Sequence, residues 1–194
     1  MVITTPPKPY TRRAVVTMGA TALAGSMLTG CSGESSPKTP EGWGTLDARQ
    51  VKVSYPEGWK PVPPGREGKK NTTSATLSKD GAVVGWIAVR PSFMAAGDLE
   101  LAVGGATATY VLGGEFKKSK DIRPGGVEAR RIDYNPQASN GLDHSPPEGT
   151  TVDGTDVVGM DAEDRPFLVR IIRKQGAVSP SDIDKIVESV RVTG

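Results

Sequence analysis

TTSATLSKDGAVVGWIAVR, residues 72–90, is the stretch that decides the fold class of this 194-residue chain. Asp80 and Gly81 at its centre are a strong signal for a two-residue turn between antiparallel strands. The arm after the turn, 82–90, is almost continuously apolar, which predicts a central strand that ends at Pro91 and keeps Trp86 in the core. The chain is therefore expected to contain an antiparallel sheet.

Further strands are predicted on both sides of this hairpin. Residues 51–55 alternate between apolar and polar side chains, as a half-buried strand does. Trp59 is expected to pack under the turn that follows this strand, and residues 59–65 are expected to form an extended loop stiffened by proline. Two more hairpins are predicted, 116–123 with 127–134 and 155–161 with 167–174. A long polar loop, 135–151, separates them.

Two amphipathic helices accompany the strands. Asp98 is expected to cap a helix that ends before the glycines at 113–114. The clearest helix follows Ser179, with Pro180 in its first position and Asp182 completing a capping box. Its apolar positions recur with helical spacing at Ile183, Ile186, Val187 and Val190, and Arg191 is placed in its last turn. We expect an α+β fold, an antiparallel sheet of about six or seven strands packed with these two helices.

Residues 1–30 are predicted to be a signal peptide. Lys8, Arg12 and Arg13 form a positive segment, and 14–28 is uncharged and mostly apolar. Arg12 and Arg13 lie in a stretch that resembles the twin-arginine export motif, although adjacent arginines also suit general secretion, so the export route stays open. A membrane-spanning helix is the alternative, but Gly, Ser and Thr make this segment a poor one.

Cys31 is predicted to carry a lipid. It follows Leu28, Thr29 and Gly30, and these four residues resemble the lipobox of bacterial lipoproteins. The resemblance implies that the Cys31 sulfur takes a diacylglyceryl group and that Cys31 becomes the mature N-terminus. Two acyl chains suffice for stable anchoring. The expected location is the extracytoplasmic face of the cell membrane, with membrane lipid as a partner.

The remaining chain divides into a tether and one domain. Residues 31–48 are expected to be the lipidated cysteine and a flexible tether, because 32–44 is polar and rich in Pro, Gly and Ser. Trp43 in this tether is expected to touch lipid, a partner or nothing. Residues 49–194 are expected to form a single α+β domain.

Cleavage would change the charge balance. The chain has 24 Lys and Arg, and loss of Lys8, Arg12 and Arg13 leaves 21 against 22 Asp and Glu. A net charge of −1 removes the basicity on which a nucleic-acid-binding function would depend. We therefore expect no nucleic-acid partner.

The order of elements resembles the PsbP/Mog1-like family, in particular small actinobacterial lipoproteins of that kind. The resemblance covers about 49–192. It depends on the Tyr55-Pro56-Glu57-Gly58-Trp59 turn after the first strand and on the closing helix with its Ile-x-x-Ile-Val-x-Ser-Val pattern at 183–190. It implies binding without catalysis. Members engage very different partners, so the family selects none.

Catalytic and metal sites have weak support in the sequence. His144 is flanked by Asp143 and Ser145, but triad members rarely adjoin in sequence and no Gly-x-Ser-x-Gly elbow is present. We expect an exposed loop histidine. The seven carboxylates between residues 143 and 164 could hold calcium, but their spacing does not match an EF-hand loop. We expect no catalytic residue, no metal and no cofactor.

Three functions remain open on these grounds. The main hypothesis is a non-enzymatic lipoprotein that binds a protein or an envelope component. The alternatives are a carrier of a small ligand or metal ion and, third, an envelope hydrolase that uses His144.

Overall fold

The computed structural model describes residues 39–63, 72–95, 97–108, 114–136, 138–139, 141 and 144–193. Several residues with predicted roles lie outside this part of the chain: Arg12, Arg13, Leu28, Thr29, Gly30, Cys31, Gly113 and Asp143. The export motif, the lipobox and the lipidated cysteine therefore stay predictions.

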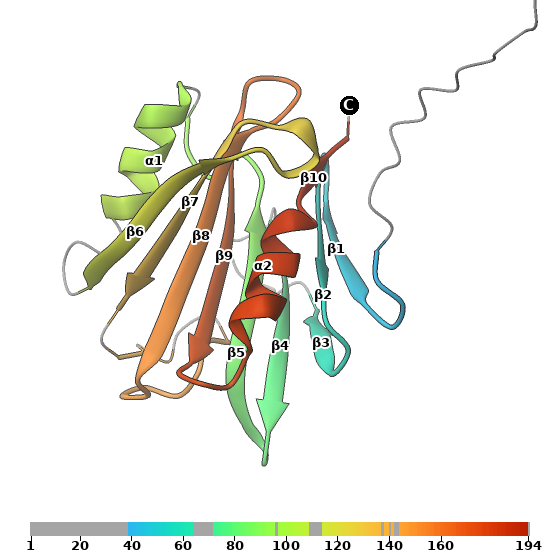
Figure 1. Cartoon of the computed structure of the whole chain (residues 1–194), viewed down its shortest axis with the longest axis vertical. Helices are drawn as coiled ribbons and strands as arrows, with labels where there is room; N and C mark the ends of the chain where they lie inside the picture. The colour runs from blue at the N-terminus through green and yellow to red at the C-terminus, as the bar shows by residue number, and fades with distance from the viewer. Residues whose placement is uncertain are drawn as a thin grey trace, which may run out of the picture. The chain divides into compact units, whose positions relative to one another are not determined.

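A seven-stranded antiparallel sheet is the frame of the domain (Figure 1), as the sequence predicts. Its strand order is β3-β4-β5-β9-β8-β7-β6. The strands are β3 (Trp59–Val62), β4 (Thr73–Lys79), β5 (Ala82–Arg90), β6 (Glu115–Ile122), β7 (Ala129–Asn135), β8 (Val152–Met160) and β9 (Pro166–Lys174). The three predicted hairpins are confirmed, and the apolar strand β5 lies inside the sheet with Trp86 buried.

The edge strand β3 corrects one expectation. Residues 59–62 pair with β4 instead of forming a loop, with Pro61 opposite Ala75. Proline cannot donate to a neighbouring strand, and it is tolerated here because β3 is at the edge of the sheet. Trp59 is buried, as expected, and a Cβ on Gly85 of β5 would lie 2.9 Å from its ring. The glycine therefore makes room for the indole.

A second, three-stranded sheet was not predicted. It consists of β1 (Gly44–Ala48), β2 (Val51–Tyr55) and β10 (Arg191–Val192), with β2 in the centre. Residues 44–48, assigned to the tether, thus belong to the domain, and Leu46 and Ala48 are buried in its core. Trp43 also packs against this core. The folded part begins earlier than residue 49.

The two helices form where the sequence predicts them. In α1 (Leu99–Ala108), Asp98 accepts a hydrogen bond from the N–H of Leu101. In α2 (Pro180–Glu188), the Ser179 hydroxyl accepts one from the N–H of Asp182. The position of Arg191 was wrong, because α2 ends at Glu188 and Arg191 lies in β10.

The helices cover opposite faces of the large sheet. Side chains alternate along the strands, and α1 packs on one set with Ile132, Val158 and Leu168. The other set packs against α2 and the small sheet, and it includes Val157 and Val169. No helix in the described ranges is long and apolar enough to cross a membrane.

Candidate functional site

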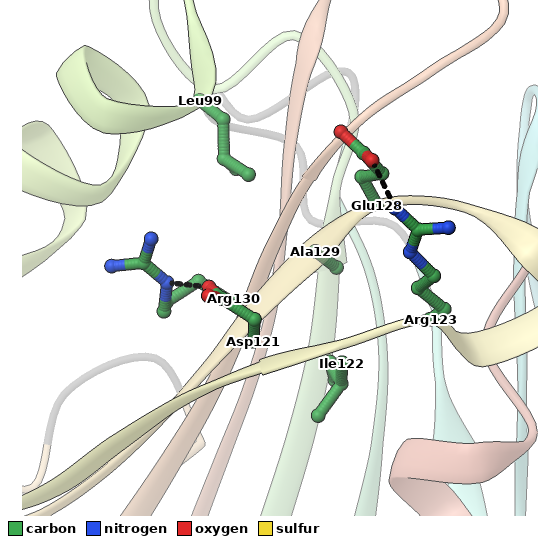
Figure 2. Close-up of a pocket in the computed structure, with 7 residues that line it drawn as sticks. All are labelled: Leu99, Asp121, Ile122, Arg123, Glu128, Ala129 and Arg130. Carbon is green, nitrogen blue, oxygen red and sulfur yellow. Dashed lines mark hydrogen bonds and ion pairs between the residues drawn. The ribbon is translucent and has the colours of Figure 1, made fainter.

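Two hollows adjoin the end of the β6–β7 hairpin, and a third lies next to one of them. The first, here called the α1 hollow, has a volume of about 470 Å³ and lies between α1 and the hairpin (Figure 2). The second, the α2 hollow, measures about 360 Å³ and lies between the hairpin and α2. The third, the β2 hollow, measures about 280 Å³ and lies between α2 and β2.

The turn of the hairpin is built from a short 3-10 helix, η1 (Pro124–Gly126). Pro124 is buried, and its carbonyl accepts a hydrogen bond from the Val127 N–H at 3.2 Å. Gly125 has φ +60° and Gly126 has φ +84°, a region that glycine adopts without steric cost. The two glycines therefore allow the chain to reverse directly over α2, which contacts η1.

Arg130 of β7 organises the α1 hollow. Its Nε donates to Asp121 of β6 at 2.5 Å, and its Nη2 donates to Glu100 of α1 at 2.6 Å. Burial disfavours the charged guanidinium, but these two carboxylates outweigh it and raise the pKa of Arg130. Leu99, Ile122 and Ala129 supply the apolar part of the lining (Figure 2). The result is a surface with fixed polar groups around an apolar centre.

Arg131 lies on the other face of the hairpin and links it to α2, as Arg130 links the hairpin to α1. Its Nε donates to Asp133 at 3.0 Å and its Nη1 donates to Asp184 of α2 at 2.6 Å. Arg191 lies beside it along the α2 hollow. The Arg191 Nη1 donates to the carbonyls of Glu188 at 2.5 Å and Val190 at 2.6 Å, so this side chain holds the end of α2.

The most buried charges form an ion pair in the large sheet. Asp156 of β8 is 0% exposed, and Arg170 of β9 donates to it through Nε and Nη2 at 2.7–3.2 Å. The Tyr134 hydroxyl donates to the same carboxylate at 3.2 Å, and Arg170 also reaches the carbonyl of Ala106 in α1. Burial raises the pKa of Asp156, while Arg170 and Tyr134 favour the ionised form. Asp156 thereby holds Arg170 in place, and Arg170 links the sheet to α1 through the Ala106 carbonyl.

The residues proposed for catalysis do not assemble into a site among the described residues. His144 is exposed with φ +63°, in agreement with an exposed loop histidine. The neighbouring Ser145 hydroxyl lies 3.2 Å from the Ser139 hydroxyl.

Several carboxylates of the 143–164 region form ion pairs with basic side chains where the structure describes them. Asp153 pairs with Lys117, and Asp161 pairs with Arg165. Within the described ranges, no three His, Cys, Asp or Glu side chains gather in a way that could hold a metal ion.

Sequence reasoning missed the residues that line the hollows. Lys120, Arg131 and Arg191 have ordinary spacings and belong to three separate strands. The only local signal was the Pro-Gly-Gly turn, which indicates a sharp reversal but not what the reversal faces.

Comparisons with known proteins support the fold. The chain matches no family model and no curated protein. It is similar to cyanobacterial PsbP (CyanoP) of Synechocystis sp. PCC 6803, with a TM-score of 0.52 and 10% identity over 78% of this chain and 93% of that one. It is also similar to the Ran-binding protein Mog1p of Saccharomyces cerevisiae, with a TM-score of 0.52 and 12% identity over 77% of this chain and 95% of that one.

A third match is to a protein of Bacteroides thetaiotaomicron, with a TM-score of 0.47 and 8% identity over 75% of this chain. This chain spans only 46% of that protein's length, and the match adds nothing to the argument. The first two matches cover nearly the whole of their proteins at very low identity, so they concern the fold alone. The chain has a PsbP/Mog1-like α+β fold.

Proposed function

We propose that this protein is a membrane-anchored extracytoplasmic lipoprotein that binds a protein or an envelope component without catalysing a reaction. The main support for the lipid anchor is the position of Cys31, directly after Leu28-Thr29-Gly30 at the end of the uncharged stretch 14–28. A positive segment with Arg12 and Arg13 precedes that stretch, as in secretory signals.

Binding is supported by exposed apolar side chains on the two elements that border the α1 hollow, α1 and β6. Leu101 of α1 is 56% exposed and Phe116 of β6 is 58% exposed, and both lie outside the lining of the hollow itself. The ion pairs of Arg130 hold polar groups of the same two elements in fixed positions. Apolar contacts with a polar surround are typical of protein interfaces. The similar chain of Mog1p is a Ran-binding protein, and we extend only protein binding, without its partner, to this chain.

The anchor is tested by converting Cys31 to Ala in the full chain and fractionating cells. The natural chain should partition into membranes and into detergent, and the variant should be released or mislocalised. Ser32→Ala is the matched control, because it changes the next residue and leaves the cysteine. Full membrane retention of the Cys31→Ala variant would contradict the anchor.

Partner binding is tested by cross-linking in intact cells followed by mass spectrometry of the bound proteins. We expect at least one enriched envelope protein, lost in a Leu101→Glu variant and kept in Gln175→Glu, whose exposed side chain lies in the β9–α2 turn. A partner that is indifferent to Leu101 would remove this surface from the proposal. Absence of any enriched protein would contradict protein binding and favour a small-ligand carrier.

A further inference from the structure

The α2 hollow and the β2 hollow form one continuous basic surface. Both are lined by Glu188 and Arg191, so Arg191 lies where the two meet. Their cations come from β2, β6, β7, α2, β10 and the η1 turn, and they outnumber the two acidic residues Asp184 and Glu188. We call this surface the basic hollow. Its six cations are Lys52, Lys120, Arg123, Arg131, Lys185 and Arg191.

Half of this positive charge is not balanced by carboxylates of the described chain. Asp184 is already bonded to Arg131. Lys120 and Lys185 have no acidic partner in the described ranges. Arg191 donates to two carbonyl oxygens, and burial lowers its pKa. Lys120 and Lys185 are exposed, and cations gathered around a hollow without carboxylate partners create a positive potential that attracts an anion able to accept charge-assisted hydrogen bonds.

Arg191 is also held in position. Its Cδ packs so closely on Gly125 that a Cβ at this glycine would lie 2.6 Å from it. Its Nη1 is committed to the end of α2. A guanidinium fixed in this way loses little freedom when another N–H group donates to an oxyanion, and its planar fork suits phosphate.

The segment that leads back to Cys31 also lines this surface. Thr39 and Pro40 line the β2 hollow, and the Thr39 hydroxyl lies 3.3 Å from the Ser54 hydroxyl of β2. Eight residue steps separate Thr39 from Cys31, which allow a reach of about 28 Å even when fully extended. If the lipid on Cys31 is inserted in the bilayer, the segment between Cys31 and Thr39 limits how far the basic hollow can lie from the headgroups.

We propose that the basic hollow binds the headgroup phosphate of anionic phospholipids and so docks the anchored domain on its own membrane. The placement relative to the bilayer rests on the proposed lipid anchor. The cations of the hollow supply the positive charge, and Arg191 supplies oriented N–H donors. The short segment between Cys31 and Thr39 keeps the hollow near the headgroups and so raises their local concentration. A solvated basic face without a ligand is the competing interpretation, and the experiment below separates the two.

The test is vesicle sedimentation of the full chain carrying Cys31→Ala, which removes the covalent anchor. Vesicles of phosphatidylcholine alone are compared with vesicles that also contain phosphatidylglycerol. Lys120→Gln and Lys185→Gln are made singly and together, since both side chains line the hollow. The matched controls are Lys60→Gln and Lys174→Gln, which remove the same charge from exposed positions on β3 and β9.

We expect each hollow variant to lower binding to the anionic vesicles about fivefold, the usual effect of one basic residue at such a surface. The double variant should lose more than tenfold, and the controls should stay within twofold of the parent. Binding to phosphatidylcholine should be the same for all. Lys8, Arg12 and Arg13 are common to every variant, so their contribution cancels in the comparison.

Two outcomes would overturn the proposal. Equal losses in the hollow variants and the controls would show attraction by net charge alone. Saturable binding of inorganic phosphate that depends on Lys120, with vesicle binding that does not, would assign the hollow to free phosphate. Failure of the lipid anchor is distinguishable from both, because it is measured by fractionation of the natural chain and does not enter this assay.

Discussion

Removal of the buried carboxylate of Asp156 should strongly destabilise the domain. Asp156 is 0% exposed and Arg170 is 13% exposed, so the pair is shielded from water. In Asp156→Ala the Arg170 guanidinium loses its hydrogen bonds to this carboxylate while it keeps the one to the Ala106 carbonyl of α1 at 3.4 Å, and the Tyr134 hydroxyl loses its hydrogen bond to Asp156. Breaking a buried pair on one side costs about 3–5 kcal/mol. For a domain of this size the melting temperature should fall by roughly 6–20 °C.

The assay is urea unfolding followed by circular dichroism and by tryptophan fluorescence. The midpoint should decrease while the slope m stays constant, since the variant buries the same surface. Asp153→Ala on the same strand is the matched control. Its pair with Lys117 has side chains that are 24% and 44% exposed, and such pairs contribute about 0–1 kcal/mol.

A rescue separates the ion pair from a general defect. Changing Arg170 to Met in the Asp156→Ala background removes the unpaired charge and refills the space with apolar atoms. We expect this double variant to recover a large part of the lost free energy, which a double-mutant cycle would quantify. If Asp156→Ala costs no more than Asp153→Ala, the pair does not fasten α1 to the sheet and the reasoning fails.

Two further predictions concern local structure. Burial opposes ionisation of Asp161, but hydrogen bonds from two backbone N–H groups and from Arg165 outweigh it and lower the pKa of Asp161. The ionised carboxylate therefore stabilises the fold above about pH 4, and this contribution is lost as the pH falls through the lowered pKa. Asp161→Asn should therefore be less stable than the parent at pH 7, with a difference in unfolding free energy that shrinks in acid. Gly125→Ala should destabilise the domain by more than Gly126→Ala, because both have a positive φ but only the first Cβ would meet the Arg191 side chain.

A specific result would contradict each of these two predictions. A stability difference for Asp161→Asn that is constant from pH 7 to pH 3 would mean that the carboxylate charge is not what stabilises the turn. Equal losses of about 1–2 kcal/mol in unfolding free energy at the two glycines would mean that backbone conformation explains both effects. The contact between residue 125 and Arg191 would then contribute nothing to stability.

The features predicted correctly are those whose causes are close together in sequence. The turn at Asp80-Gly81, the cap at Ser179 and the period of residues 183–190 each involve a few adjacent residues, and local geometry decides them. Such signals were enough for the three hairpins and the two helices, and for the PsbP/Mog1-like resemblance that the structural comparisons support.

The errors occurred where distant segments complete one another. Residues 44–48 have the composition of a tether and become β1 only because β2 offers a partner and the core accepts Leu46. Residues 59–62 have the composition of a loop, and the free edge of β4 makes them a strand. Arg191 continues the helical pattern, but pairing with Lys52 draws it into β10. In each case tertiary pairing overrides local preference.

By itself the sequence determined the α+β class, the hairpins and the helix caps, because each depends on neighbouring residues. It also predicts a signal peptide with Arg12 and Arg13 and a lipid anchor at Cys31. Only the tertiary structure decided the second sheet, the buried pair of Asp156 and Arg170, and the basic hollow. The cations of that hollow lie as far apart in the chain as residues 52 and 191. No spacing in a linear sequence encodes their meeting, because it results from the packing of α2 and the hairpin on one sheet.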